Sequence, residues 1–147
     1  MTRAIRAVAA GKAWEKAVSY TPAVRVETGP LLFLSGQVAR GADGSLVGRG
    51  DLTEQTRQAF RNLCDLLEAA GSSVNHVIKL TYFVRDMSQW SKVAAVRAEF
   101  FPAYLPASTT VEVSRLFNPD YLIEIEAIAL IPKRPQATRS RKRRRSA

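Results

Sequence analysis

Residues 121–131 read Tyr-Leu-Ile-Glu-Ile-Glu-Ala-Ile-Ala-Leu-Ile, and this alternating run is the clearest structural signal in the chain. Successive side chains of a β-strand point to opposite faces of a sheet, so the run is typical of a strand. One face takes Ile123, Ile125 and the alanines, while the other takes Glu124 and Glu126 with apolar neighbours. We therefore expect a strand with one face fit for a core and one face that is partly charged.

Four further strands are expected around it. Residues 77–84 and 109–114 also alternate between apolar and polar side chains. Residues 24–27 and 31–37 are rich in strand-forming side chains and flank a Thr-Gly-Pro turn, which predicts a hairpin.

Two helices are expected between these strands. Asp51 is a suitable N-cap, with Glu54 three residues later as in a capping box, and Gly71 ends the apolar periodicity that follows. A second helix is expected to begin near Ser88 and to kink or end at Pro102. The resulting order, β-β-α-β-α-β-β, predicts an α+β sandwich with two helices on one sheet face.

The uncovered face of this sheet needs a partner. It should present three glutamates beside apolar side chains, a mixture too apolar for open water and too charged for a dry core. An oligomer whose sheets meet around a partly hydrated centre satisfies both demands, and a closed symmetric ring is its simplest form. The side chains assigned to this face are Glu112, Leu122, Glu124, Glu126, Ile128 and Leu130.

The charge divides the chain into three parts: a leader of uncertain order (1–21), one domain (22–131) and a basic tail (132–147). The tail holds eight of the 22 lysines and arginines and no acid, whereas the rest carries 14 basic and 13 acidic side chains. We expect the tail to be disordered, with weak, salt-sensitive nucleic-acid binding as the alternative. The residues that would bind nucleic acid are Arg141, Lys142, Arg143, Arg144 and Arg145.

Cysteine and histidine are scarce. Cys64 is the single cysteine, which excludes an intrachain disulfide, and with no apolar signal-peptide core in the leader we expect a cytoplasmic protein. His76 is the single histidine, so no metal site built from several histidines and cysteines is expected. No run is long enough to span a membrane, and no phosphate-binding glycine motif is present.

Several fragments, in this order and spacing, resemble the RidA/YjgF family, which also carries the endoribonuclease L-PSP name. The resemblance covers roughly residues 20–132. It rests on Leu-Leu-Phe-Leu-Ser-Gly-Gln (31–37), Gln-Thr-Arg-Gln-Ala (55–59), Leu-Glu-Ala-Ala-Gly (67–71), Val-Ile-Lys (77–79), Pro-Ala (106–107), Thr-Val-Glu-Val (110–113) and Ile-Glu-Ile-Glu-Ala-Ile-Ala (123–129).

The resemblance implies a chorismate mutase-like homotrimer with small-molecule clefts between subunits. Family members hydrolyse reactive enamines and imines to a keto acid and ammonia, without a metal or organic cofactor. Carried over, the catalytic positions are Glu124 and Tyr20, and the ligand-binding positions are Ser35, Gly36 and Ser108. Glu124 would hold or deliver a water, and the Gly36 amide would bind an oxyanion or carboxylate.

The chain departs from the family at Ser108, where deaminase members have an arginine. An arginine can hold a substrate carboxylate through a bidentate fork, and serine has neither the charge nor the reach. Ser108 and Thr110 would add neutral hydrogen bonds, which favours a neutral or cationic ligand. Arg25 and Arg115 are the substitutes considered, and the sequence favours neither.

Three functions follow as hypotheses. The first is a small-molecule-binding trimer, with deaminase or related hydrolase activity of altered specificity. The second is a nucleic-acid-associated or ribonuclease-like protein that acts through its tail. The third is a non-catalytic regulatory trimer, in which Glu124 only lines a hydrated axis.

Overall fold

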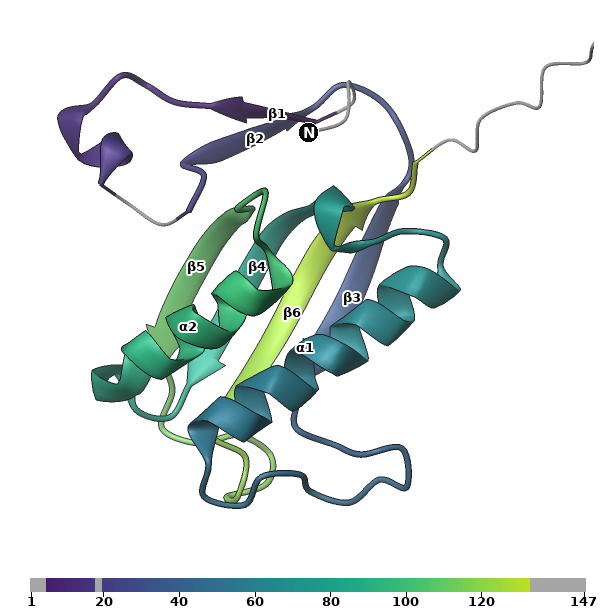
Figure 1. Cartoon of the computed structure of the whole chain (residues 1–147), viewed down its shortest axis with the longest axis vertical. Helices are drawn as coiled ribbons and strands as arrows, with labels where there is room; N and C mark the ends of the chain where they lie inside the picture. Colours follow the sequence, from purple (N-terminus) through teal and green to yellow (C-terminus); the bar gives the residue numbers. More distant parts are fainter. Residues whose placement is uncertain (1–4, 18–19, 133–147) are drawn as a thin grey trace, which may run out of the picture.

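A four-stranded mixed sheet beneath two helices forms the body of the computed structural model, which describes residues 5–17 and 20–132 (Figure 1). Strand β6 is antiparallel to both its neighbours, whereas β4 and β5 run parallel. The predicted α+β class is confirmed. The strands, in sheet order, are β3 (Leu31–Gln37), β6 (Ile123–Leu130), β4 (Val77–Val84) and β5 (Ala107–Glu112).

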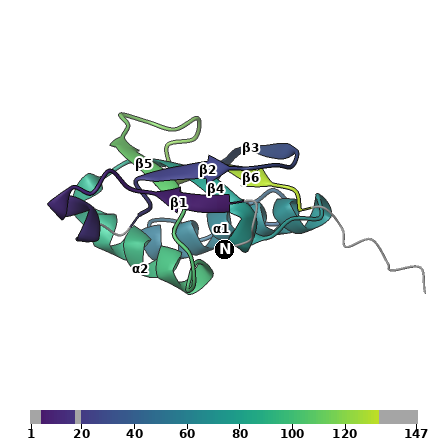
Figure 2. The same cartoon turned by 90° about the horizontal axis from the view of Figure 1, so that it is seen from above.

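The two helices lie in one layer on one face of the sheet (Figure 2). Helix α1 (Leu52–Ala69) begins as predicted, since the Asp51 carboxylate accepts a hydrogen bond from the Glu54 amide at 3.1 Å. Helix α2 (Trp90–Phe100) starts two residues later than expected, because a 3₁₀ turn, η3 (Met87–Gln89), precedes it. Within residues 5–17 and 20–132, no helix lies on the opposite face of the four-stranded sheet.

The core lies between the helices and the sheet. As the alternation of residues 121–131 predicts, Ile123 and Ile125 are fully buried. The Phe60 ring of α1 packs edge-on to Tyr82 of β4, with ring centroids 6.3 Å apart, and stacks on Phe100 of α2 at 5.0 Å. Each fully buried side chain of this size contributes about 1.5–3 kcal/mol to stability.

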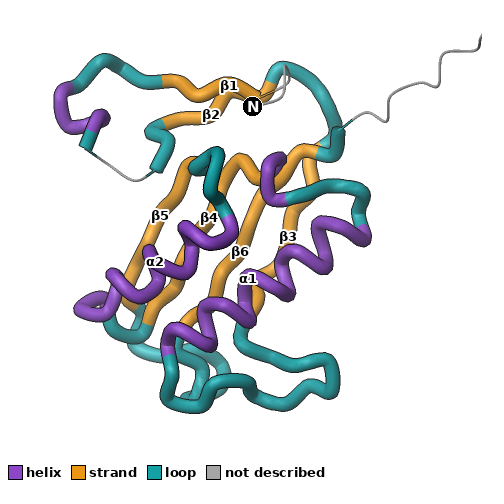
Figure 3. Tube along the Cα trace, in the orientation of Figure 1, coloured by secondary structure: helices purple, strands orange, loops and turns teal. Residues whose placement is uncertain are grey.

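The predicted hairpin between residues 24–27 and 31–37 is wrong. Strand β2 (Ala23–Val26) pairs instead with β1 (Ile5–Val8), and β3 pairs with β6. Figure 3 shows this two-stranded sheet beyond the end of the four-stranded one. Between β2 and β3 the chain turns at Gly29, whose φ of 123° suits glycine, and the turn packs against Leu130. Strand β1 and the 3₁₀ turn η1 (Ala13–Lys16) lie in the part that we assigned to the leader.

Glu112 is not on the uncovered face. It pairs with Val84, whose side chain is buried on the helix side, and its carboxylate accepts a hydrogen bond from the Met87 amide at 2.8 Å. The sequence analysis therefore assigned Glu112 to the wrong face of the sheet. An edge strand can place a charged side chain beside the end of a helix without burying it. Leu130 is also buried rather than open, beside the Gly29 turn.

Gln55 ties the sheet to the loops at one end of α1. Its side chain is fully buried, and its amide nitrogen donates to the carbonyls of Gly48, at 3.1 Å, and Asp120, at 2.8 Å. Its oxygen accepts from the Leu122 amide at 2.8 Å, directly before β6 begins. These three bonds fix where β6 starts and hence where Glu124 lies.

In the part of the chain that the structure describes, no helix is both long and apolar enough to cross a bilayer. The 3₁₀ turn η2 (Val74–His76) leads directly into β4.

Candidate functional site

The Glu124 side chain lies half-buried on β6 against the backbone of Gly36 on β3. A methyl group on Gly36 would overlap Oε1 of Glu124 and would come within 2.8 Å of its Cγ. Glycine at this position therefore lets the carboxylate lie across the strand. Gly36 and Glu124, both assigned to the cleft from the sequence, are thus in contact within one chain.

A β-bulge produces this close approach. Leu34 pairs with Ala127 and Gln37 pairs with Ile125, so Ser35 and Gly36 together occupy the space opposite one residue of β6. A bulge of this kind bends the strand and re-aims its side chains and backbone groups. Ser35 is exposed, and the Gln37 side chain folds back to donate to the Ser35 and Gly36 carbonyls at 3.1 and 3.3 Å.

Three other predicted residues meet in a cavity of about 420 Å³ between α2, β5 and the segment before β2. We call it the Ser108 cavity. Ser108 and Thr110 come from β5, and Tyr20 comes from the chain that leads into β2. Its lining residues are Ala17, Tyr20, Met87, Trp90, Arg97, Ser108 and Thr110.

Tyr20 reaches this cavity because the next residue is fixed to the chain just before β5. The Thr21 amide donates to the Pro106 carbonyl at 3.3 Å, and the Thr21 hydroxyl donates to the Leu105 carbonyl. These bonds join residues more than 80 positions apart in the sequence.

Within one chain, the Ser108 cavity and Glu124 lie on opposite sides of the sheet. Ser108 pairs with Leu80, a fully buried residue of the helix-covered face, whereas Glu124 pairs with Phe83 on the uncovered face. The structure thus assembles the predicted residues into two groups: Ser35, Gly36 and Glu124 in one, and Tyr20, Ser108 and Thr110 in the other.

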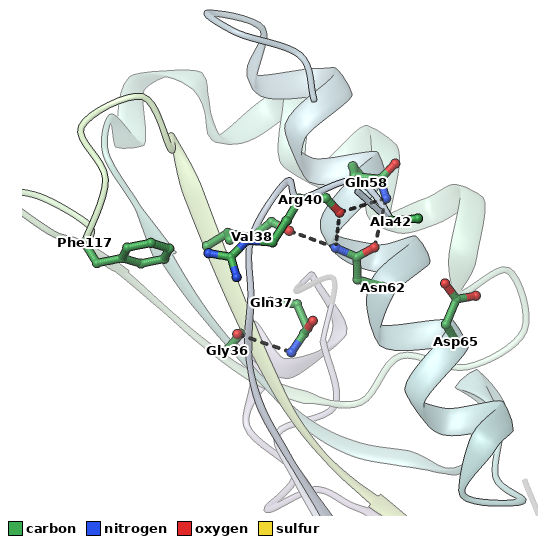
Figure 4. Close-up of a pocket in the computed structure, with 10 residues that line it drawn as sticks. Gly36, Gln37, Val38, Arg40, Ala42, Gln58, Asn62, Asp65 and Phe117 are labelled. Atoms are coloured by element: carbon green, nitrogen blue, oxygen red, sulfur yellow. Dashed lines mark hydrogen bonds between the residues drawn. The ribbon is translucent and has the colours of Figure 1, made fainter. Parts of the chain in front are cut away.

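A second cavity, of about 380 Å³, begins at Gly36 and runs between the end of β3 and α1 (Figure 4). The amide side chain of Asn62, which lines this cavity, binds backbone groups: it donates to the Val38 and Arg40 carbonyls at 3.0 and 2.9 Å. The Arg40 guanidinium lies 5.5 Å from the centroid of the Phe117 ring. The Asn62 hydrogen bonds therefore fix the chain directly after β3, the strand that carries Gly36.

The sequence analysis named neither Arg97 nor Trp90 as a site residue. The two residues are seven positions apart on α2, which places them on the same helix face, and both line the Ser108 cavity. The helical spacing was the available signal, but an arginine at a core-facing position is easily taken for a surface residue when the second helix has no clear apolar stripe.

Cys64 and His76 line neither cavity. Burial raises the pKa of the Cys64 thiol, with a further rise from the charge of Asp65, which disfavours a reactive thiolate. Burial lowers the pKa of His76, whose Nδ1 lies 3.0 Å from the Ser73 hydroxyl. Among the residues described, no three potential ligands of histidine, cysteine, aspartate or glutamate type gather into a metal site.

The tail residues predicted to bind nucleic acid, Arg141, Lys142, Arg143, Arg144 and Arg145, lie outside the described part of the chain.

Comparisons with known protein sequences agree on one family. The model of the endoribonuclease L-PSP family matches residues 10–131. A RutC family protein of Pyrococcus horikoshii is 45% identical over 104 residues, which cover 71% of this chain and 82% of that protein. A protein of Dermatophagoides farinae, named 2-iminobutanoate/2-iminopropanoate deaminase, is 32% identical over 112 residues, covering 76% of this chain and 85% of its own length.

Solved structures give the same result. A Rid family protein of Yersinia pestis superposes with a TM-score of 0.79 at 31% identity, over 86% of this chain and 98% of its own. A YjgF/YER057c/UK114 family member from Mycobacterium tuberculosis has a TM-score of 0.61 at 35% identity, with the same coverage of both chains.

Proposed function

The chain belongs to the RidA/YjgF (endoribonuclease L-PSP) family, and from this premise we propose that it forms a homotrimer whose inter-subunit clefts bind a small metabolite and hydrolyse its enamine or imine group. The deaminase name of the Dermatophagoides farinae relative supports this reaction class. The two groups of site residues support the location: the Glu124 group of one subunit would face the Ser108 cavity of the next.

The observation that carries the proposal is the contact between Glu124 and Gly36 on a sheet face that none of the described helices covers. This face also exposes large apolar side chains: Phe33 is 72% exposed and Val111 is 41% exposed. Apolar surface of this kind is typical of a protein interface. A neighbouring subunit would cover it and bring its own Tyr20 and Ser108 toward the carboxylate.

Hydrolysis of an imine in this cleft requires only water and one carboxylate. The Glu124 carboxylate accepts a proton from a water molecule as the water oxygen bonds to the carbon of the protonated C=N group. The carbinolamine then takes a proton on nitrogen from Glu124, its C–N bond breaks, and its hydroxyl proton is released as the carbonyl forms. The products are a keto compound and ammonia, and an enamine enters the sequence after protonation at its carbon.

The chain's hydroxyl groups would orient the substrate. Tyr20, Ser108 and Thr110, which each carry a hydroxyl group, all line the Ser108 cavity. Hydrogen bonds placed before the reaction lower the barrier, because they need no reorganisation when charge develops on the substrate.

The test is ammonia release from 2-aminoacrylate generated in the assay. Glu124→Gln keeps the side-chain shape and removes the proton acceptor, so the rate should fall about 10²–10⁴-fold toward the uncatalysed value. Glu126→Gln, two residues along the same strand face, is the matched control and should keep at least half of the activity. Equal activity of the two variants would contradict the proposal.

A further inference from the structure

We infer that a cavity at the C-terminal end of α2 receives an apolar side chain of the ligand, and that the two small residues Ala94 and Ala98 set the size of that side chain. The inference rests on the proposed function, in which the reacting part of the ligand lies at the Ser108 cavity. It adds a selectivity: enamines and imines with a branched or aromatic side chain should be better substrates than 2-aminoacrylate, whose side chain is a single carbon.

This cavity has a volume of about 590 Å³ and lies between the last turns of α2 and the segment that leads into β5. We call it the Ala94 cavity. Ala94 and Ala98 are four residues apart, so they lie on the same face of α2. Because neither side chain extends beyond Cβ, the helix leaves open a space that a leucine at either position would partly fill.

The rest of the lining is mainly apolar. Phe101 and Leu105 belong to the segment after α2, and Tyr104 precedes Leu105 in the same segment. Among the described residues, no acidic side chain lines this cavity or the Ser108 cavity, so the ammonium group of a cationic side chain would find no counterion there. An apolar group that enters such a cavity is stabilised because apolar surface is removed from water. The lining therefore favours a hydrocarbon side chain.

The Ala94 cavity adjoins the Ser108 cavity along α2. Arg97 lines both cavities. Ala94 lies between Trp90, which lines the Ser108 cavity, and Arg97 on one helix face, because these three residues are spaced four and three positions apart. One ligand can therefore occupy both cavities, with its polar part near the hydroxyl-bearing residues of β5 and its side chain along α2.

Hydrogen bonds of Thr21 also connect the two cavities. Thr21 follows Tyr20, which lines the Ser108 cavity, and its hydroxyl donates to the carbonyl of Leu105, which lines the Ala94 cavity. The Thr21 amide donates to the Pro106 carbonyl at 3.3 Å. These bonds bring the chain at Tyr20 next to the chain at Leu105, so the linings of the two cavities are connected at a second place.

The first test compares the imines that an amino-acid oxidase makes from L-alanine and from L-leucine, with the full-length protein added. Semicarbazide traps the imine that remains, so the loss of trapped product measures hydrolysis by the protein. We expect kcat/KM for the leucine-derived imine to exceed that for the alanine-derived imine by at least about tenfold, since an apolar pocket discriminates by roughly tenfold or more for a methylene that it binds. Equal values, or a preference for the smaller imine, would overturn the inference.

Filling the cavity should remove this selectivity. Ala94→Leu should lower the ratio of the two kcat/KM values by at least about tenfold, because the leucine occupies the space for the substrate's side chain. Ala95→Leu is the matched control: Ala95 is exposed on the same helix, lines neither cavity, and should keep both rates. Leucine forms helices nearly as well as alanine, so neither change should disturb α2 itself.

Ala98→Leu gives the answer if Ala94→Leu does not fold, because Ala98 is exposed and a larger side chain is tolerated there. It should lower the same ratio at least about fourfold, the effect of one methylene that is no longer buried. An unchanged ratio in a folded Ala94→Leu protein, or in Ala98→Leu where Ala94→Leu does not fold, would refute the inference.

Binding of the keto acid products separates the inference from the proposed function. Calorimetry should show that 4-methyl-2-oxopentanoate binds at least about tenfold more tightly than pyruvate, and Ala94→Leu should remove this preference. A protein that shows this binding preference but hydrolyses neither imine would support the role of the Ala94 cavity and refute the proposed hydrolysis. Hydrolysis of both imines at one rate, with no binding preference, would do the reverse.

Discussion

At Gly36, the absence of a side chain determines where the Glu124 carboxylate can lie. The carboxylate crosses the strand at the bulge, in space that a Cβ would fill. The clashing atoms belong to a flexible side chain rather than to backbone, so a larger residue would move Glu124 instead of breaking the sheet.

Gly36→Ala should therefore lower ammonia release at least about tenfold while changing the free energy of unfolding by less than about 1 kcal/mol. The rate should fall because the Glu124 carboxylate, the proton acceptor, is displaced while the fold stays intact. Steady-state rates measure the loss of activity, and urea unfolding measures the free energy of unfolding. Gly41→Ala, in the loop beyond β3, is the control and should keep the wild-type rate; a similar loss there would show that the effect is not specific to Glu124.

The roles of single residues stay predictions, but the structure shows which of them lie near one another. The family resemblance implied one cleft, whereas within one chain Gly36 lies against Glu124 and Tyr20 lines a separate cavity with Ser108 and Thr110. Arg97 was not predicted, since nothing local distinguishes a helical arginine that turns inward from one that turns outward. Only the packing of α2 on β4 and β5 decides that.

At the scale of elements, α1 does more than cover the sheet. Through Gln55 it holds both the loop before it and the chain that enters β6. Removing a buried amide that satisfies three backbone groups lowers the free energy of unfolding by more than the net contribution of its hydrogen bonds, because those groups are then left unpaired.

Gln55→Leu should lower the free energy of unfolding by about 2–4 kcal/mol, since the leucine fills the volume but leaves the Gly48 and Asp120 carbonyls and the Leu122 amide unsatisfied. Denaturant unfolding measures it. Gln58→Leu, on the same helix but only half-buried, should cost less than about 1 kcal/mol. Equal losses of unfolding free energy in the two variants would mean that the buried hydrogen bonds of Gln55 do not contribute to stability.

The alternation of residues 121–131 predicted a strand with a buried isoleucine face, and the capping pattern at Asp51 predicted the start of α1; both are confirmed. Strand pairing was less predictable. Residues 24–27 and 31–37 have the local features of a hairpin, yet β3 pairs with β6, which lies about 90 residues further along the chain. Pairing depends on which edges remain free after the sheet forms, and this information is not local.

On the scale of the whole molecule, the uncovered sheet face is the surface that should join the subunits. Phe33 and Phe117 form a matched pair of variants to test this surface, because they are 72% and 69% exposed. Phe33 lies on β3 of the uncovered face, whereas Phe117 lies on the loop between β5 and β6.

Phe33→Asp should convert the proposed trimer to monomers and abolish the proposed ammonia release, because a charge is costly in an apolar interface. Light scattering should change from three times the chain mass of 16.2 kDa to one. Phe117→Asp should leave the trimer mass unchanged. A wild-type protein that is monomeric would remove the shared cleft altogether.

The most direct test of a cleft shared between subunits is to mix two inactive variants. Glu124→Gln lacks the proton acceptor, and Ser108→Phe fills the Ser108 cavity. If each cleft takes Glu124 from one subunit and the Ser108 cavity from the next, trimers reassembled from equal amounts should contain intact clefts and recover about one quarter of the wild-type ammonia release. If both groups act within a single chain, no mixture contains an intact site, and activity that stays at the level of the separate variants would contradict the account.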